Sequence, residues 1–325
     1  MKNIFCLLLL IVVLSWGGFA EAQQPGKVPW IGMLLSGTPS SHKYMIDEFQ
    51  QGLRERGYIP RKNILFEFRY AEGKLERLPE LAKELVQLNV DVIFTNATPG
   101  SVAAKQATNT IPIVFTGVGD PIEAGLVSSI ARPGGNVTGI YILSPDLGGK
   151  RLELLKEVSP KITHVAVLWS RSASTTVAIK ATQAAADALH LQLLSVEVRS
   201  PDHFAAATEE IVKKRARAIL TNPSPVLGTI RARVVEFATK NRLPAMYANE
   251  QFVEAGGLMS YAHSSTEQYR RAAVFVDKIL KGTKPADLPV ELPMKLELTI
   301  NLNAAKQISL TIPQWTLMKA DRVIR

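Results

Sequence analysis

The stretch IPIVFTGVGDPIEAGL, residues 111–126, contains the pattern that decides the fold. Its first seven residues form a short apolar run that predicts a buried strand, and the pattern beyond them predicts a helix over 121–131. Gly117 and Gly119 form a G-x-G between the two, as in the phosphate loop of dinucleotide-binding folds. The third glycine of that fingerprint would stand where this chain has Ile122, so the stretch argues against a nucleotide site.

The order of a strand followed by a helix continues on both sides of this stretch. Short apolar runs, typical of strands buried on both faces, alternate with amphipathic segments of helical period. Such alternation predicts an α/β fold with parallel sheets covered by helices on both faces. The predicted strands are 28–36, 63–71, 90–96, 111–117, 163–170, 191–198, 218–222, 244–248 and 258–262, and the predicted helices are 41–58, 75–89, 98–109, 121–131, 146–160, 172–190, 202–216, 226–242 and 265–282.

The series of strands and helices starts again after a turn-rich segment, RPGGNVTG at 132–139. Two similar series predict two doubly wound lobes with a cleft between them. We expect residues 27–141 plus about 263–325 to form the first lobe, and about 142–262 to form the second. The proline-rich tail is predicted to add a strand at 296–302 and a short helix at 303–308.

The N-terminus has the features of a secretory signal peptide. Lys2 precedes the apolar run IFCLLLLIVVLSW, and Ala20 and Ala22 form an A-x-A cleavage site. We therefore expect residues 1–22 to be removed, which would leave a soluble periplasmic protein beginning at Gln23. The alternative is an uncleaved membrane anchor, but the run is short for a bilayer span of about 20 residues.

The composition argues against several classes of protein. The single cysteine, Cys6, lies in the apolar run, so the mature chain would have no disulfide, thiolate zinc site or cysteine nucleophile. The net charge is +9, but basic and acidic residues are interleaved, as in DEFQQGLRERG, so no nucleic-acid partner is predicted. No G-x-S-x-G or H-E-x-x-H occurs, and no catalytic residue, metal or cofactor is predicted. The histidines are His42, His164, His190, His203 and His263, of which His42 and His263 lie near the predicted cleft loops.

Open parallel sheets bind ligands at the carboxyl ends of their strands. This rule, with the aromatic and amide groups nearby, nominates Ser36, Asn96, Thr98, Gly117 and Asp120 in the first lobe, and Trp169, Asn222, Tyr247, Asn249, Glu250 and Tyr261 in the second. Thr98 and Asp120 have an alternative role as helix caps. Trp169 and Tyr247 have an alternative role in core packing.

The segment ATPGSVAAKQATNTIPIVFTGVGDPIEAGLVSSIARPGGNVTGI, residues 97–140, resembles the tryptophan/tyrosine-type substrate-binding proteins of ABC importers. FVEAGGLMSY, AAVFVDKILKGTKPADLPVE and LTINLNAAKQ fit the same family, and the resemblance covers about 28–312. It implies a type I periplasmic-binding fold, in which two lobes joined by a hinge close on a solute without catalysis. It also implies that the loops matching Ala97–Pro99 and Gly117–Pro121 face the ligand, which adds Pro99 to the candidate site.

The second lobe departs from that family at two loops. TNPSP at 221–225 stands where aromatic-amino-acid binders have a polar Thr-Asp-Asn-type loop. Asn249 and Glu250 stand where those binders have an Asp-Thr pair, which is expected to hold the ligand ammonium. The identity of the ligand is therefore left open, with an amino-acid-like compound as one candidate.

The leading hypothesis is an exported, monomeric receptor that delivers a small molecule to the permease of an ABC importer in the inner membrane. One alternative is a sensor of the same fold that presents its bound state to a signalling partner. A second alternative is a secreted α/β hydrolase or nucleotide-using enzyme, and the missing motifs argue against it.

Overall fold

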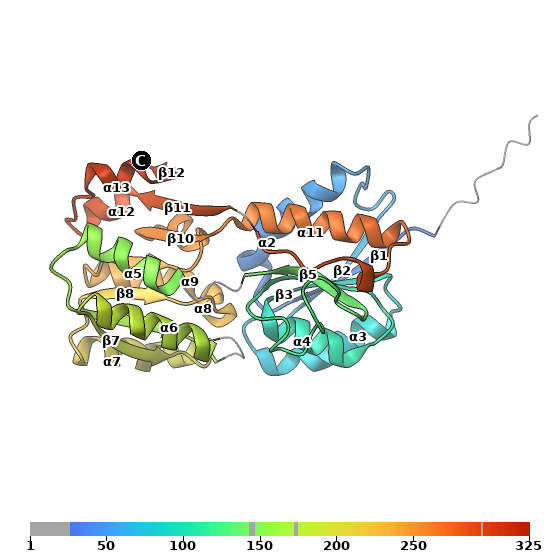
Figure 1. Cartoon of the computed structure of the whole chain (residues 1–325), viewed down its shortest axis with the longest axis horizontal. Coiled ribbons are helices and arrows are strands. Elements are labelled where there is room, and N and C mark those ends of the chain that lie inside the picture. Colours follow the sequence, from blue (N-terminus) through green and yellow to red (C-terminus); the bar gives the residue numbers. More distant parts are fainter. Residues whose placement is uncertain (1–26, 143–146, 172–174, 294) are drawn as a thin grey trace, which may run out of the picture.

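The computed structural model describes residues 27–142, 147–171, 175–293 and 295–325, and the predicted signal peptide lies outside these residues. The chain forms two α/β lobes that lie next to each other along the long axis of the molecule (Figure 1).

The first lobe contains a five-stranded parallel sheet in the order β2-β1-β3-β4-β5. Its elements are β1 (Trp30–Leu35), α2 (Pro39–Arg54), β2 (Leu65–Tyr70), η1 (Leu75–Arg77), α3 (Leu78–Gln87), β3 (Val92–Asn96), α4 (Ala97–Ala107), β4 (Ile113–Val118), β5 (Val137–Tyr141), α11 (Ser265–Leu280) and η3 (Pro285–Asp287). Met33 and Leu35 of β1 pack with α2 and α11, whereas Leu34 packs with α3 and α4. Both faces of the sheet are therefore covered, which explains the continuous apolar strands.

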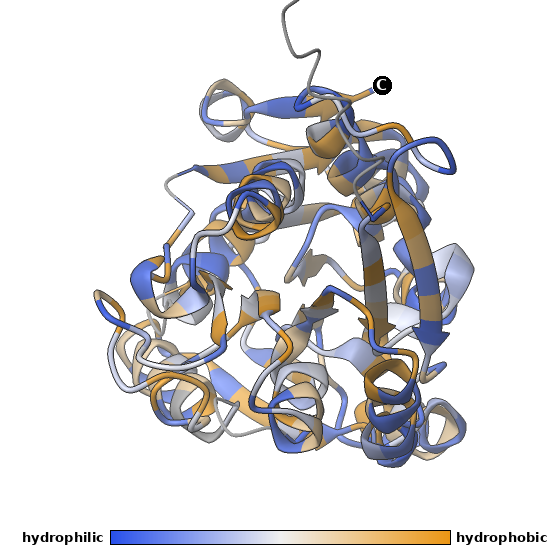
Figure 2. Cartoon of the chain, turned by 90° about the vertical axis from the view of Figure 1, so that its right-hand side faces the viewer, coloured by the Kyte–Doolittle hydropathy of each residue, from blue (hydrophilic) through white to orange (hydrophobic). Residues whose placement is uncertain are grey.

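The second lobe contains a seven-stranded sheet in the order β12-β11-β10-β9-β8-β6-β7. Its elements are α5 (Leu147–Val158), β6 (His164–Trp169), α6 (Thr175–Ala188), β7 (Gln192–Glu197), η2 (Pro201–His203), α7 (Phe204–Lys213), β8 (Ala218–Thr221), α8 (Pro225–Thr229), α9 (Arg231–Lys240), β9 (Ala245–Tyr247), α10 (Gln251–Glu254), β10 (Met259–His263), β11 (Leu296–Asn301), α12 (Leu302–Gln307), α13 (Gln314–Met318) and β12 (Arg322–Ile324). Two apolar clusters, one on each face of this sheet, form its core. Figure 2 looks along the long axis and shows strands surrounded by helices in which hydrophobic and hydrophilic residues alternate.

The chain crosses between the lobes after β5, between β10 and α11, and between Glu291 and β11. Before the last crossing, the backbone of Glu291 pairs with the first sheet: its N–H donates to the carbonyl of Gly139 at 3.0 Å, and its carbonyl accepts from Tyr141 N–H at 3.0 Å. These crossings leave the carboxyl ends of the two sheets facing each other.

The prediction that the whole tail belongs to the first lobe is wrong for its strands. β11 pairs antiparallel with β10, and β12 pairs parallel with β11, so both extend the second sheet. Only α11 and the segment that follows it pack on the first lobe. The apolar pattern of β11 indicates that it is buried, but it does not indicate which sheet has a free edge to receive it.

Three further predictions differ from the structure. The predicted helix 121–131 is a series of turns, in which Gly125 has a φ of +66° and interrupts any helix. The segment 132–139 was predicted as a turn, but β5 begins within it. The predicted helix 226–242 is divided into α8 and α9 at Ile230.

Gly139 is the position in β5 that admits no side chain. Its φ is +151°, and a Cβ at this residue would lie 2.1 Å from the carbonyl oxygen of Phe115 in β4. We expect Gly139→Ala to lower the free energy of unfolding by about 3 kcal/mol, measured by urea denaturation. Gly135→Ala is the matched control because a Cβ there meets nothing within 4 Å, and it should change stability by less than about 0.5 kcal/mol. Equal effects of the two substitutions would contradict this account.

Candidate functional site

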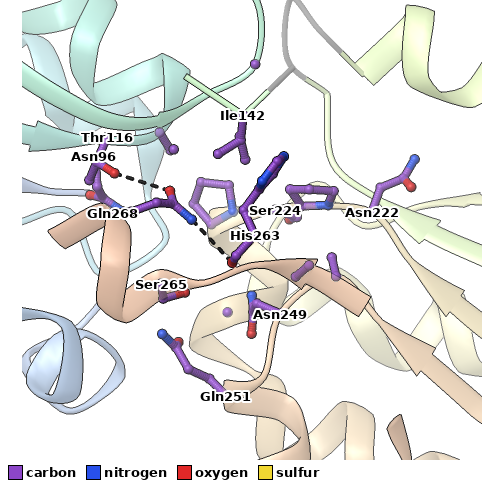
Figure 3. A pocket seen from close by; sticks show the side chains of 18 of the residues that line it. Asn96, Thr116, Ile142, Asn222, Ser224, Asn249, Gln251, His263, Ser265 and Gln268 are labelled. Atoms are coloured by element: carbon purple, nitrogen blue, oxygen red, sulfur yellow. Dashed lines mark hydrogen bonds between the residues drawn. The ribbon is translucent and has the colours of Figure 1, made fainter. Parts of the chain in front are cut away.

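A cavity of about 230 Å³ lies between the lobes at the carboxyl ends of both sheets. Its polar lining residues include Ser41, His42, Asn96, Thr98 and Thr116 from the first lobe, Arg151, Asn222, Ser224, Arg231, Asn249 and Gln251 from the second, and His263, Ser265 and Gln268 at the crossing into α11. Met45, Ile142, Leu147 and Tyr269 add apolar surface. Figure 3 shows side chains from both lobes around the same space. Small-molecule sites have this composition of apolar walls and a few placed polar groups.

Asn96 ties together two loops of the first lobe. Its Oδ1 accepts from the backbone N–H of Ser36 at 3.1 Å, so its Nδ2 is the group that donates to His42 Nε2 at 2.9 Å. His42 must then carry its proton on Nδ1, which lies 3.3 Å from the carbonyl oxygen of Thr38. The amide of Asn96 therefore uses its oxygen and one N–H within the protein, and these bonds position the wall of the cavity.

Burial sets the charge of His42. Desolvation lowers its pKa to about 4, and the positive charge of Arg231 acts in the same direction. The neutral imidazole at pH 7 is the form that can both donate to Thr38 and accept from Asn96.

Gly117 lies at an irregularity in β4 rather than in a phosphate loop. The pairing of β4 with β5 shifts register between Thr116 and Val118, and Gly117 has a φ of +68°, which favours glycine. The chain then turns so that the N–H of Gly119 donates to Thr98 Oγ1 at 3.4 Å. This turn brings Gly117 and Gly119 into the cavity lining.

Gln268 of α11 connects the first lobe to the crossing. Its Oε1 accepts from Thr116 Oγ1 at 3.3 Å, and its Nε2 donates to the carbonyl of His263 at 3.4 Å (Figure 3). These two hydrogen bonds connect β4 of the first lobe to the end of β10, where the chain crosses between the lobes. Next to it, the hydroxyl of Ser265 bonds to Glu250, whose pKa is raised by burial.

Arg151 of α5 is the buried cation of the second lobe, with 4% of its surface exposed. Its Nε donates to the carbonyl of Tyr261 at 2.7 Å, and its Nη2 donates to the carbonyl of Ala248 at 3.4 Å. Desolvation lowers its pKa to about 10, so the guanidinium is still charged at neutral pH. Arg151 thereby holds β9 and β10 together and keeps a positive charge in the cavity wall.

Two amides of the second lobe have hydrogen-bonding atoms that the described protein does not satisfy. Asn222 Nδ2 and Asn249 Oδ1 are buried without a partner, and both residues line the cavity. Native proteins rarely leave such atoms unpaired, because each costs about 1–3 kcal/mol. Because both residues line the cavity, a bound solute could supply the missing hydrogen-bond partners of these two atoms.

Arg231 of α9 forms a direct link between the lobes. Its Nη1 donates to the carbonyl of Ser41 at 3.2 Å, and its Nη2 approaches the carbonyl of Ser40 at 3.4 Å. Nearby, a Cβ added to Gly73 of the first lobe would lie 3.1 Å from Thr229 Oγ1 of the second. The lobes are therefore in contact beside the cavity.

The structure divides the sequence-predicted residues into two groups. Asn96, Thr98, Pro99, Gly117, Asn222 and Asn249 line the cavity. Ser36, Asp120, Trp169, Tyr247, Glu250 and Tyr261 do not. A ligand contact remains a prediction for every residue of both groups.

The residues of the second group have contacts elsewhere in the protein. Asp120 Oδ1 accepts from the N–H groups of Ile122 and Glu123 at 2.9 and 3.0 Å, which is its capping role, although in a turn. Trp169 Nε1 donates to Ser195 Oγ on β7 at 2.9 Å.

The remaining four lie behind or beside the cavity wall. The ring of Tyr247 is buried and stacks on Phe252 at 4.9 Å. Ser36 is fully buried behind Asn96, Glu250 lies behind Ser265, and the ring of Tyr261 packs on the core of the second lobe.

Sequence analysis did not nominate Arg151, Arg231, Ser265 or Gln268. The sequence does contain an indication of Arg151. The residue lies on the apolar face of its helix with Leu147, Leu155 and Val158, and a cation at such a position is unusual unless it has a specific role. Ser265 and Gln268 lie at the start of a strongly amphipathic helix, and their pattern matches ordinary capping and packing.

Within residues 27–142, 147–171, 175–293 and 295–325, no group of His, Cys, Asp and Glu side chains is arranged to hold a metal ion. In the same residues, no helix combines the length and apolarity that a bilayer span requires.

The family model described as ABC transporter substrate binding protein matches residues 35–324, which include both lobes and the cavity. The chain belongs to this family. It is 27% identical over 264 residues to the tyrosine-binding protein of Clostridioides difficile (strain R20291), covering 81% of this chain and 75% of that protein. The resemblance drawn from residues 97–140 is thus confirmed.

Solved structures agree with this assignment. A conserved domain protein from Vibrio cholerae superposes with a TM-score of 0.84 at 28% identity, covering 91% of this chain and 100% of the other. A domain from Streptococcus pneumoniae in complex with L-Trp superposes with a TM-score of 0.83 at 26% identity, covering 91% and 99%. The type I periplasmic-binding fold is confirmed, and the protein is a solute-binding receptor of the ABC family.

The lowered pKa of His42 predicts a pH dependence of stability. An unfolded-chain histidine titrates near pH 6.5, so below that pH the unfolded chain binds a proton that the folded protein excludes. The contribution of His42 to the free energy of unfolding is therefore fully present above about pH 6.5, and it is lost as the pH falls from there to about 4. Between about pH 7 and about pH 4.5, we expect the parent to lose about 2–3 kcal/mol more than His42→Gln in urea unfolding.

The exposed His190 supplies the control for this measurement. His190→Gln should keep the pH dependence of the parent. A parent and a His42→Gln variant that lose stability in parallel would show that His42 is not excluded from protonation in the folded state.

Proposed function

We propose that this receptor captures a small, amino-acid-related solute between its lobes and delivers it unchanged to the permease of an ABC importer. The observation that carries the proposal is the cavity between the lobes, because its wall contains buried polar atoms of Asn222 and Asn249 without a protein partner. A solute that supplies those partners would bind in this cavity, where residues of both lobes line the wall.

The names of two relatives support the solute class. One is a tyrosine-binding protein, and another is bound to L-Trp. The cavity of about 230 Å³ has room for a molecule of modest size rather than for a polymer, and its apolar wall suits an apolar side group.

Closure of the lobes is part of the proposal. The L-Trp complex superposes on 91% of this chain with a TM-score of 0.83, whereas a ligand-free, open substrate-binding protein from Clostridium difficile covers the same share with a TM-score of 0.64, which supports a placement of the lobes nearer to the liganded form. Arg231 contributes direct hydrogen bonds across the lobes in this arrangement. Solute that contacts both lobes would shift the population toward this closed form.

Binding and closure test the function together. Purified protein without residues 1–22 is screened by thermal shift against amino acids and related acids and amines, with L-tyrosine and L-tryptophan included. A true ligand at about a hundred times its Kd should stabilise the folded protein by about 2.7 kcal/mol. Small-angle scattering should show a smaller radius of gyration with that ligand. No stabilisation by any compound and an unchanged radius would contradict the proposal.

Asn249→Ala locates the binding in the cavity. We expect its affinity for the identified ligand to fall at least about tenfold, since about 1.4 kcal/mol corresponds to a factor of ten, while Tm stays within a few degrees. Asn241→Ala, at an exposed position of the same lobe, should bind as the parent does. An Asn249→Ala variant of parental affinity would exclude this residue from the site.

We also propose that the receptor works as a monomer in the periplasm after removal of residues 1–22. The A-x-A of Ala20 and Ala22 after an apolar run supports export and the removal of residues 1–22. Intact mass of protein exported by a bacterial host should correspond to a chain that begins at Gln23. A full-length or lipid-modified chain would contradict the proposed processing.

A further inference from the structure

We infer that the solute is a small carboxylic acid whose carboxylate binds to the second lobe, between Arg151 and Asn222. The inference rests on the proposed function, because it assigns a chemical class to the solute of the same cavity. It goes further in naming the group of the solute that the site requires and the two side chains that bind it.

Arg151 supplies the charge. Its guanidinium lines the cavity and has five N–H donors, while its two acceptors in the described protein are the neutral carbonyls of Tyr261 and Ala248. None of the described carboxylates forms an ion pair with it. Burial of a cation without a counter-ion is costly, and an anionic solute offsets that cost.

Asn222 supplies a second donor on the same edge of the sheet. The residue is 3% exposed, and its Nδ2 has no acceptor. The preceding residue, Thr221, accepts from the backbone N–H of Ala248 at 2.9 Å, and the carbonyl of Ala248 accepts from Arg151. These bonds connect the loop that contains Asn222 to the Arg151 guanidinium through Ala248, and both residues line the cavity.

The surroundings favour the same sign of charge. Arg231 also lines the cavity, and among the described lining residues the side chains that are charged at neutral pH are those of the two arginines. Burial, together with the positive charge of Arg151, lowers the pKa of His263. The field at this wall therefore favours an anion.

Asn249 leaves the rest of the solute less restricted. Its Oδ1 is an acceptor without a partner, and an amide oxygen accepts equally from a hydroxyl, an amide N–H or an ammonium group. In this assignment, Arg151 and Asn222 select a solute with a carboxylate, whereas Asn249 accepts an ammonium group without selecting for it. An amino acid and its deaminated analogue are both expected to bind, whereas the corresponding amine is not.

Matched trios of compounds test this expectation by titration calorimetry. L-Tyrosine is compared with 3-(4-hydroxyphenyl)propionate and tyramine, and L-tryptophan with 3-indolepropionate and tryptamine. The same design is extended to leucine, 4-methylpentanoate and isoamylamine. In a trio that binds, we expect the two carboxylates to bind at least about thirtyfold more tightly than the amine. An amine that binds as tightly as its acid would overturn the inference and leave the receptor function intact.

Asn222→Asp identifies the residues involved, because it keeps the shape of the side chain and replaces the N–H donor with an oxygen. We expect the ratio of carboxylate affinity to amine affinity to fall at least about tenfold in this variant. A merely structural defect would weaken every compound of a trio and leave the ratio unchanged, which would overturn the assignment to Asn222. Asn241→Asp adds the same charge at an exposed position and should keep the parental ratio.

Arg151→Lys is the second variant, since it keeps a cation but loses the planar fork of donors. It should lower carboxylate affinity at least about tenfold with little effect on the amine. If no compound of any trio binds, and the wider screen is also empty, both the receptor function and this inference fail. If the screen finds only neutral or cationic ligands, the function holds and the carboxylate inference is wrong.

Discussion

Parallel pairing of strands imposes the constraint on which the site depends. Each parallel connection must return the chain across the sheet, so the loops that leave the strands collect at one edge of each sheet. Here the chain crosses between the lobes at those edges, after β5 and after β10, and the two carboxyl edges face each other. The hydrogen bonds of Gln268 to Thr116 and to the carbonyl of His263 fix this juxtaposition at a crossing. The cavity is the space between the two edges.

The strand-end rule predicts loops well and side-chain directions poorly. It found Asn96, Asn222 and Asn249, which line the cavity, because Asn96 ends β3 and the other two follow β8 and β9. It also nominated Trp169 and Tyr247, which occupy equivalent positions but face away. The direction alternates from one strand residue to the next, and the last residue of a strand can face either way. Tyr247 is drawn into the core by its stacking on Phe252, a contact that the sequence does not indicate.

The alternation of strands and helices was sufficient to predict two α/β lobes, but not which lobe receives the tail. Periodicity indicates how much of a segment is buried. The partner of β11 depends instead on which of the two sheets has a free edge, and here that edge is β10 of the second sheet. The same limit explains Arg151. Its position on the apolar face of α5 marks it as unusual, but its carbonyl partners lie about a hundred residues away along the chain.

The two walls of the cavity differ in how their polar groups are satisfied. In the first lobe, Asn96 and His42 bond to each other and to the backbone of Ser36 and Thr38, so these groups have partners without a solute. In the second lobe, the Arg151 guanidinium bonds to neutral carbonyls and has no counter-ion among the described residues, and Asn222 Nδ2 and Asn249 Oδ1 have no partner there. In an open receptor, water would satisfy these atoms, while a closed and empty receptor would bury them at about 1–3 kcal/mol each. In the proposed function, closure therefore depends on a solute that supplies the missing partners, which restricts the closed form to the loaded receptor.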